Sequence, residues 1–238
     1  MELFETPLSP QKELDYEILK MLFQRNQLFV HPNSSPDAFT PFADDKIDKF
    51  YTGKVMWLWR PTISDKERNE PWRLAAEIEN IFKIGEWPKP WKDGAKHLGL
   101  WKKIALNECF VYLNYSLEQH QMSFTSGDKT TQTFLSLLND FSVGQMWNFI
   151  WRAAKDAAAY YQRGGISKQQ AANSIVGSIQ RQGERALAEK WEVANYRRIP
   201  QIPVSVVTQI LFVTALKIGD NWMESSLKDF QHRDENST

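Results

Sequence analysis

Apolar residues recur every three or four positions along most of this chain, the spacing that places them on one face of an α-helix. Near the start, the pattern follows Ser9 and Pro10, which are typical of a helix start, and predicts a helix from residue 10 into the high twenties. A second long stretch predicts a helix over about 98–119. We therefore expect a mostly α fold, a single helical-bundle-like domain of about six to eight helices over 1–238.

The clearest local signals lie in the C-terminal half. At 142–145 and again at 167–170, a Ser is followed three residues later by a Gln, the capping-box pattern of a helix start. Gly164 and Gly165 stand between the two helical stretches and are typical of a helix end. The sequence therefore predicts an αα-hairpin, in which the first helix ends at the glycines and the second runs to about Ala188.

Two short apolar stretches are compatible with either a strand or a helix. The stretch 54–60, KVMWLWR, is too short for its period to decide, so a minor β element is allowed there. In 204–218, the valines favour a strand, whereas the length of the stretch and Gly219 after it favour a helix. We take 204–218 as a helix.

The N-terminal third is expected to be rich in loops. The stretch 31–42 contains three Pro and two adjacent Ser, which are typical of a loop, and short helices are expected over 43–52 and 71–85. An alternative to one undivided domain is therefore a loop-rich N-terminal lobe, 1–95, beside a helical part, 96–238.

The composition excludes several kinds of site. Cys109 is the only cysteine, which excludes an intrachain disulfide and a Cys-rich zinc or iron–sulfur site. None of the four His lies in a metal-ligand spacing, and the common nucleotide-binding, zinc-protease and hydrolase motifs are absent. We therefore expect no metal and no cofactor.

Nothing in the sequence predicts association with a membrane. The first residues are acidic and lack the positive start and apolar run of a signal peptide. The stretch 204–218 is interrupted by Ser, Thr, Gln and Lys and is shorter than the about 20 residues of a membrane span. We expect a soluble, cytoplasmic protein.

Charge is neutral in total but unevenly distributed. Residues 1–50 hold five basic and nine acidic residues, whereas residues 151–200 hold nine basic and four acidic residues, a balance of −4 against +5. Tyr and Trp are interleaved with the basic residues, a mixture that suits a phosphate backbone with bases stacked on the rings, although a solvated helix surface would look the same. The candidate nucleic-acid contacts are Arg152, Lys155, Arg163, Lys168, Arg181, Arg185, Arg197 and Arg198.

The fragment RNQLFVH places Arg25 and His31 six positions apart, with a polar residue directly after the Arg. It resembles the short Arg/His motif of HEPN-type RNA-cleaving helical domains. The resemblance implies that His31 transfers a proton and that Arg25 holds a phosphate, which suits the titration of His near neutrality and the planar guanidinium of Arg. It extends over seven residues, and an Arg at a helix end followed by a His in a turn is the structural alternative. If the chain is an enzyme, a metal-independent ribonuclease is the expectation.

The chain contains ten Trp, which either fill the core or line a groove for a partner. Trp57 and Trp59 point to one side if 54–60 is a strand, and Trp87 and Trp91 lie in a Pro-containing loop. These four are the candidate partner-binding residues. Together with the absence of a catalytic motif, they predict a non-enzymatic helical interaction module that binds a protein partner or itself. A protein that binds RNA or DNA is the alternative.

Overall fold

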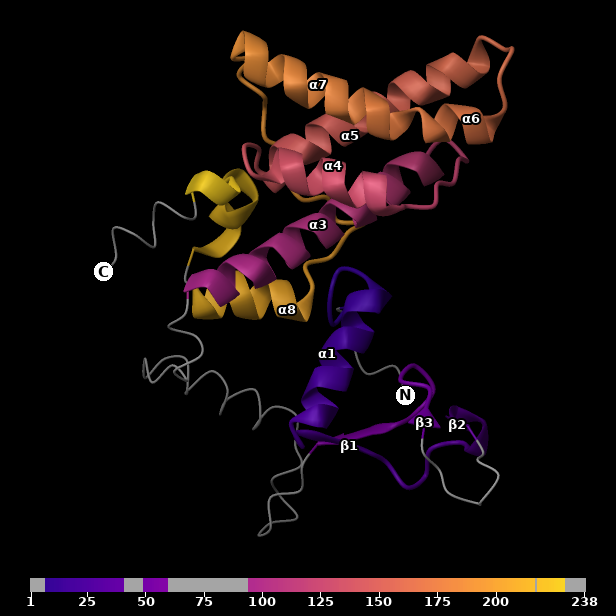
Figure 1. The fold of residues 1–238 in the computed structure, drawn as a ribbon, viewed down its shortest axis with the longest axis vertical. Coiled ribbons are helices and arrows are strands. Elements are labelled where there is room, and N and C mark those ends of the chain that lie inside the picture. Colours follow the sequence, from indigo (N-terminus) through magenta and orange to yellow (C-terminus); the bar gives the residue numbers. More distant parts are fainter. Residues whose placement is uncertain (1–6, 41–48, 60–93, 217, 230–238) are drawn as a thin grey trace. The chain divides into compact units, whose positions relative to one another are not determined.

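The computed structural model describes residues 7–40, 49–59, 94–216 and 218–229, and Figure 1 shows the path of the chain. The chain divides into two compact units. The helical unit combines 1–10 with 87–238, and the N-terminal unit consists of 11–86. The expected single domain and the lobe boundary at residue 95 stay predictions.

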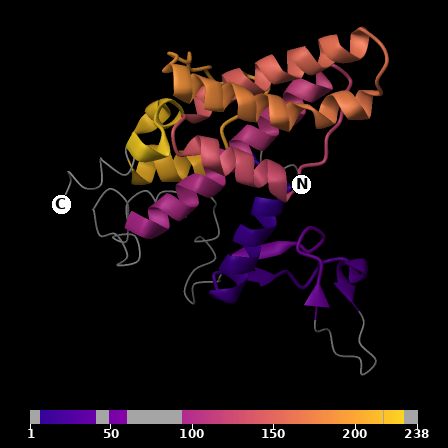
Figure 2. The same ribbon diagram turned by 45° about the horizontal axis from the view of Figure 1, so that its top comes forward.

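Five helices form most of the helical unit: α3 (Gly94–Glu118), α4 (Asp128–Leu138), α5 (Val143–Gln162), α6 (Lys168–Asn173) and α7 (Ile175–Glu189). α5 is the central helix, because it packs against α3, α6 and α7. Figure 1 shows α5, α6 and α7 on one side of α3, and Figure 2 shows α5 and α7 running alongside each other. The expectation of a mostly α fold with a minor β element is confirmed.

The predicted αα-hairpin is present. Ser142 and Ser167 each form a complete capping box with the Gln three residues later. Gly164 and Gly165 both have positive φ, 82° and 85°, a conformation that glycine adopts without steric cost and that ends α5. The second helix is interrupted at Ser174, whose hydroxyl donates to the carbonyl of Ala171, so that α6 and α7 are separate helices.

The N-cap of α5 provides a test of how much one capping residue contributes. The Ser142 hydroxyl accepts the Gln145 N–H at 3.1 Å and donates to Oδ1 of Asn195, and Ser142 is buried. Ser142→Ala is expected to lower the free energy of unfolding by about 1–2 kcal/mol, measured by urea denaturation. Ser167→Ala removes the same capping box at an exposed position and is the matched control, with an expected loss of about 0.5–1 kcal/mol. Equal losses would contradict a role for Asn195.

The C-terminal stretch completes the helical unit. α8 (Val206–Thr208) continues directly into the π-helix η3 (Gln209–Ala215), and the 3-10 helix η4 (Gly219–Glu224) follows. The helix expected over 204–218 is therefore confirmed, although much of it has π rather than α geometry: the Leu216 N–H donates to the carbonyl five residues back. The carbonyls of Pro7 and Leu8 accept from the first N–H groups of α8, which attaches these two residues to the helical unit.

In the described residues of the N-terminal unit, 11–40 and 49–59, the chain forms an α-helix and two small antiparallel sheets. The elements of this unit are α1 (Lys12–Gln24), β1 (Leu28–Val30), the 3-10 helix η1 (Pro36–Ala38), β2 (Phe39–Thr40), β3 (Lys49–Phe50) and β4 (Trp57–Trp59). β1 pairs with β4 in the register Phe29↔Leu58, and β2 pairs with β3. The ambiguous stretch 54–60 thus contains a strand rather than a helix.

Two expectations for this unit differ from the structure. α1 ends at Gln24, before the high twenties, because Asn26 adopts a left-handed conformation with φ of 55° and the chain then turns into β1. The short helix expected over 43–52 is wrong where the structure describes it, since Lys49–Phe50 is a strand. The helix expected over 71–85 lies outside the described residues.

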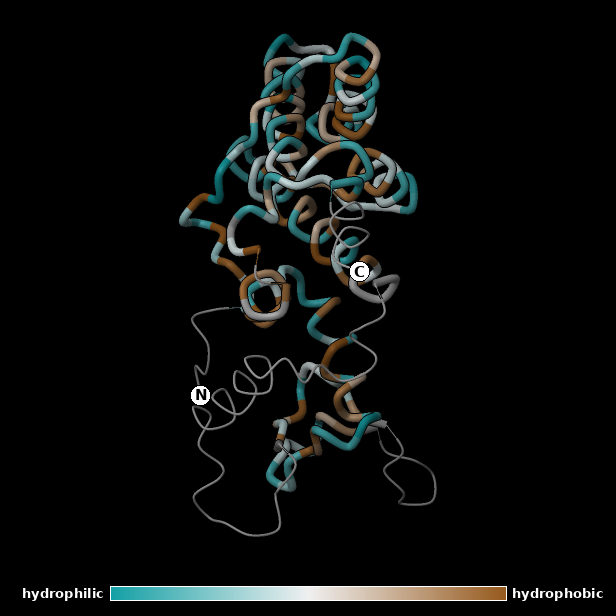
Figure 3. Tube along the Cα trace, turned by 90° about the vertical axis from the view of Figure 1, so that its left-hand side faces the viewer, coloured by the Kyte–Doolittle hydropathy of each residue, from teal (hydrophilic) through white to brown (hydrophobic). Residues whose placement is uncertain are grey.

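The core of the helical unit follows from the periodicity of its helices. Figure 3 shows apolar and polar residues alternating along the helices of this unit, so that each helix has a side to bury and a side to expose. Trp101, Trp147 and Trp222 are fully or almost fully buried, and the Trp147 ring stacks on Tyr112 with 4.2 Å between centroids. These three of the ten Trp in the sequence therefore belong to the core of the helical unit.

Candidate interaction surface

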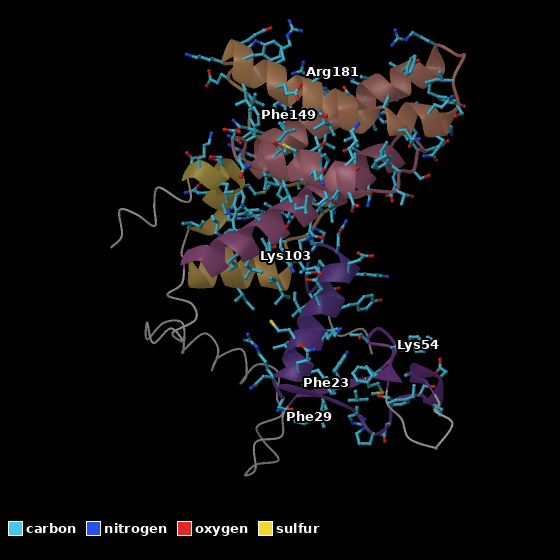
Figure 4. All side chains as sticks on the ribbon, in the orientation of Figure 1. Phe23, Phe29, Lys54, Lys103, Phe149 and Arg181 are labelled. Carbon is cyan, nitrogen blue, oxygen red and sulfur yellow. The ribbon has the colours of Figure 1, made fainter. Side chains whose placement is uncertain are left out.

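Seven of the eight predicted nucleic-acid contacts are exposed in the helical unit. They lie on α5 and its C-cap, at the start of α6, along α7 and in the segment that follows α7: Arg152, Lys155, Arg163, Lys168, Arg181, Arg185 and Arg197. Figure 4 shows Arg181 on the outer side of α7, whereas Phe149 points into the interior. The eighth, Arg198, has a different environment, described below.

The exposed side of α5 is set by its alanine pairs. α5 buries 153–154 and 157–158 and leaves Trp151, Lys155 and Tyr160 exposed, with Arg152 between them. At about 100° per residue, Trp151 and Lys155 lie on the same side of α5, whereas Tyr160 lies about half a turn from Trp151. These aromatic and basic side chains share the exposed half of the helix, here called the stripe, with Trp151 and Tyr160 at its opposite edges.

Each exposed ring of this region has a basic group over it. Lys155 lies over the ring of Trp151 at 5.2 Å from the centroid, and Arg163 lies over Tyr160 at 5.9 Å. The rings of Trp151 and Tyr160 are 43% and 45% exposed. Such pairs are cation–π interactions, which hold the ring and the charge together at the surface.

Two further pairs lie at the ends of the hairpin. Arg185 of α7 lies over Trp191 at 4.9 Å and forms an ion pair with Glu189. Lys168 of α6 lies over Tyr161 at 5.6 Å and also approaches the carbonyl of Gln121. Tyr161 follows Tyr160 by one position, or about 100° around the helix, and lies off the stripe.

The segment 191–203, here called the connector, joins α7 to α8 and lies across the first turns of α5. Gln145 and Asn148 of α5 donate from their side-chain amides to carbonyls of the connector, at 3.1 Å each. The Tyr196 N–H donates to the carbonyl of Gly144, and the Tyr196 ring lies 6.1 Å from that of Trp151. A Cβ on Gly144 would lie 2.9 Å from the carbonyl oxygen of Tyr196, so the close approach requires glycine.

These contacts join α5 and the connector into one surface, here called the α5–connector surface. It consists of Trp151, Arg152, Lys155, Tyr160, Arg163, Trp191 and Tyr196. The side chains that it presents are flat rings and cations. Side chains of these two kinds can contact anionic and aromatic groups.

Arg198 is an interior residue. Its side chain is 15% exposed, and Nη2 lies 2.8 Å from Oε1 of Glu108, which is 1% exposed. The guanidinium lies between the rings of Trp147 and Trp222, at 5.6 Å and 5.8 Å from their centroids, and donates to the carbonyl of Ile202. Arg198 therefore attaches the connector to the core.

Burial dominates the electrostatics around this ion pair. It raises the pKa of Glu108, although the Arg198 charge and the hydrogen bonds from Arg198 and Thr208 lower it. Burial also raises the pKa of Cys109 well above its usual value, with the Glu108 charge adding to it, and raises the pKa of Tyr112 to about 12. These groups are held neutral or paired inside the core, out of reach of a large partner.

The predicted catalytic pair lies in the N-terminal unit. Arg25 is exposed as the C-cap of α1, and His31 follows β1. The Nδ1 atom of His31 accepts the backbone N–H of Asn33 at 3.0 Å. Within the residues that the structure describes, no hydrogen bond or ion pair joins Arg25 to His31. The structure thus gives the His31 ring a local structural bond, and its role in proton transfer stays a prediction.

The predicted partner-binding Trp residues have different environments. Trp57 packs edge-on against Phe23 and Phe50, and its indole N–H donates to the carbonyl of Thr52, so it belongs to the small core of the N-terminal unit. Trp59 of β4 pairs through its backbone with Leu28 of β1. Trp87 and Trp91 lie outside the described residues.

Sequence reasoning missed two residues of this region. Trp151 carries a detectable signal, because it precedes Lys155 by four positions on a predicted helix. Glu108 carries none, because its partner Arg198 is 90 positions away and the pairing depends on the fold.

Among the described residues, no group of three or more His, Cys, Asp and Glu side chains is placed to hold a metal ion. No described helix combines the length and the apolar character that a membrane crossing requires. Comparisons with known proteins found no family model, no curated protein and no solved structure that matches this chain.

Proposed function

We propose that this chain is a non-enzymatic interaction module that binds its partner through the α5–connector surface. The observation that carries the proposal is the exposure of Trp and Tyr rings that each hold a Lys or Arg over them. Trp, Tyr and Arg are the residues that contribute most to binding energy at interfaces. Rings fixed by neighbouring side chains lose little conformational entropy when a partner binds.

Charge indicates what kind of partner fits. Residues 151–200 carry a balance of +5, whereas residues 1–50 of the same chain carry −4. A partner with acidic groups is therefore attracted, and a second copy of this chain supplies such groups. Binding of an acidic protein segment and self-association are both forms of this function.

Reversing the charge of the surface tests the proposal. The double variant Arg152→Glu, Lys155→Glu is expected to weaken association about tenfold or more, because both side chains are exposed and carry the positive charge of the α5 stripe. Self-association is measured by sedimentation equilibrium, and binding of a labelled Glu-rich peptide by fluorescence anisotropy. Lys129→Glu, at an exposed position of α4, is the control and should change neither.

The proposal is overturned if none of the probes binds, or if the double variant weakens the binding of none of them. The probes are a second copy of the chain, the Glu-rich peptide and the oligonucleotides described below.

A further inference from the structure

We infer that the α5–connector surface binds single-stranded nucleic acid, an inference that rests on the proposed function and names its partner class. A nucleotide offers one flat base and one negative phosphate. Each ring–cation pair of the surface offers a flat face and a positive charge within 5–6 Å of each other. The repeated unit of the surface therefore matches the repeated unit of a nucleic-acid chain.

The rings require a strand whose bases are free. About two-fifths of Trp151 and Tyr160 is exposed, enough for a base to stack on one side of each ring. In a duplex the bases already stack on one another, so a duplex offers only its phosphates to this surface.

The length of the stripe fits several nucleotides. Trp151 and Tyr160 are nine positions apart on α5, which places them about 14 Å apart along the axis and about half a turn apart around it. The axial component alone equals about four steps of a stacked strand at 3.4 Å per nucleotide, so a strand that contacts both rings crosses the exposed half of α5 over four or more nucleotides. The connector extends the surface beyond Trp151 through Tyr196, whose ring lies 6.1 Å away.

The side chains between the rings favour a nucleic acid over a protein. The fully buried core of a protein interface is depleted in charged residues. Here the residues between and beside the rings are Asn148, Arg152 and Asp156, which are polar or charged. Such surroundings suit phosphates and water better than an apolar protein surface.

The cations are available for phosphates. In the described part of the chain, Arg152 and Lys155 form no ion pair, whereas Arg185 is paired with Glu189. Further along, Arg163 donates to a carbonyl of its own helix and keeps its charge exposed. These three cations outnumber the exposed Asp156 carboxylate beside them, so the stripe keeps a net positive charge for phosphates.

The test separates stacking from charge by fluorescence anisotropy over a series of salt concentrations. The probe is a labelled oligothymidylate of about 20 nucleotides, compared with the same strand paired to its complement. The single strand is expected to bind more tightly than the duplex. Trp151→Ala is expected to weaken its binding about 5- to 100-fold without changing the salt dependence. Lys155→Gln is expected to lower the slope of log K against log salt by about 0.7.

Two adjacent tyrosines provide the matched control. Tyr160→Ala removes a ring of the stripe and should weaken binding, whereas Tyr161→Ala removes the ring that lies off the stripe and should not. All four side chains changed here are exposed, and thermal unfolding followed by circular dichroism checks that each variant is folded.

The possible outcomes distinguish the nucleic-acid inference from the proposed interaction module. Equal binding of single strand and duplex, with no effect of Trp151→Ala, overturns the inference. Variant-sensitive binding of the Glu-rich peptide without binding of the oligonucleotide also overturns it but leaves the interaction module standing. If no probe and no second copy binds, both fail.

Discussion

Arg198→Met is expected to lower the free energy of unfolding by about 3–5 kcal/mol. The change keeps most of the volume of the side chain but removes its charge from between two Trp rings, and it leaves the Glu108 carboxylate buried without its cation. An unpaired buried charge costs far more than the pair itself contributes. Urea denaturation, followed by circular dichroism, measures the loss.

The adjacent arginine is the control for this prediction. Arg197 is exposed, so Arg197→Met should change stability by less than about 0.5 kcal/mol. The double variant Glu108→Leu, Arg198→Met removes both charges and should recover much of the loss, because an apolar pair of similar volume often replaces a buried ion pair without cost. Similar losses for the Arg197 and Arg198 variants would show that the ion pair does not anchor the connector.

Gly183→Ala is expected to destabilise the protein by about 1–3 kcal/mol, even though alanine is the better helix former. A Cβ on Gly183 of α7 would clash with Cδ2 of Leu137 in α4. Leu137 is 5% exposed and packed in the core, so it has little room to move away. The absence of a side chain at this position therefore sets how closely α7 approaches α4, and thermal or urea unfolding measures the cost.

The same helix offers a matched control and a rescue. At Gly177 the nearest atom to an added Cβ is the end of Arg181, 3.4 Å away, so Gly177→Ala should stabilise the protein by up to about 1 kcal/mol. Combining Gly183→Ala with Leu137→Ala should cost less than the sum of the two single changes, because the smaller side chain leaves room for the Cβ. Strictly additive costs would exclude a clash between these two residues.

Local signals allowed the hairpin to be predicted from the sequence. The capping boxes at Ser142 and Ser167 and the two glycines between them each act within one turn of backbone, so four or five adjacent residues contain the whole interaction. The interruption at Ser174 was not predicted, because the apolar pattern continues through it into α7.

Pairings between distant residues explain what the sequence could not predict. β1 and β4 pair although their nearest partners, Val30 and Trp57, are 27 positions apart, and neither strand has a pattern long enough to identify its partner. The π geometry after α8 likewise depends on the surrounding packing, because a stretch of seven residues is too short for its apolar period to identify it.

The candidate surface was predictable in part. Exposed basic residues follow from helical periodicity, and seven of the eight proposed contacts are exposed. Arg197 and Arg198 are indistinguishable in sequence, yet Arg197 is exposed and the Arg198 side chain is only 15% exposed, because only Arg198 meets Glu108 across the fold. Which of two adjacent arginines enters the core is decided by tertiary packing alone.

The burial of Cys109 makes the chain suitable for thiol labelling without further engineering. The side chain is fully buried in α3, next to Glu108, and it is the only thiol of the sequence. A maleimide or disulfide reagent therefore reacts only when the helices around α3 separate. The labelling rate then measures the free energy of opening of this core. A rise of about 1.4 kcal/mol in that free energy slows labelling about tenfold.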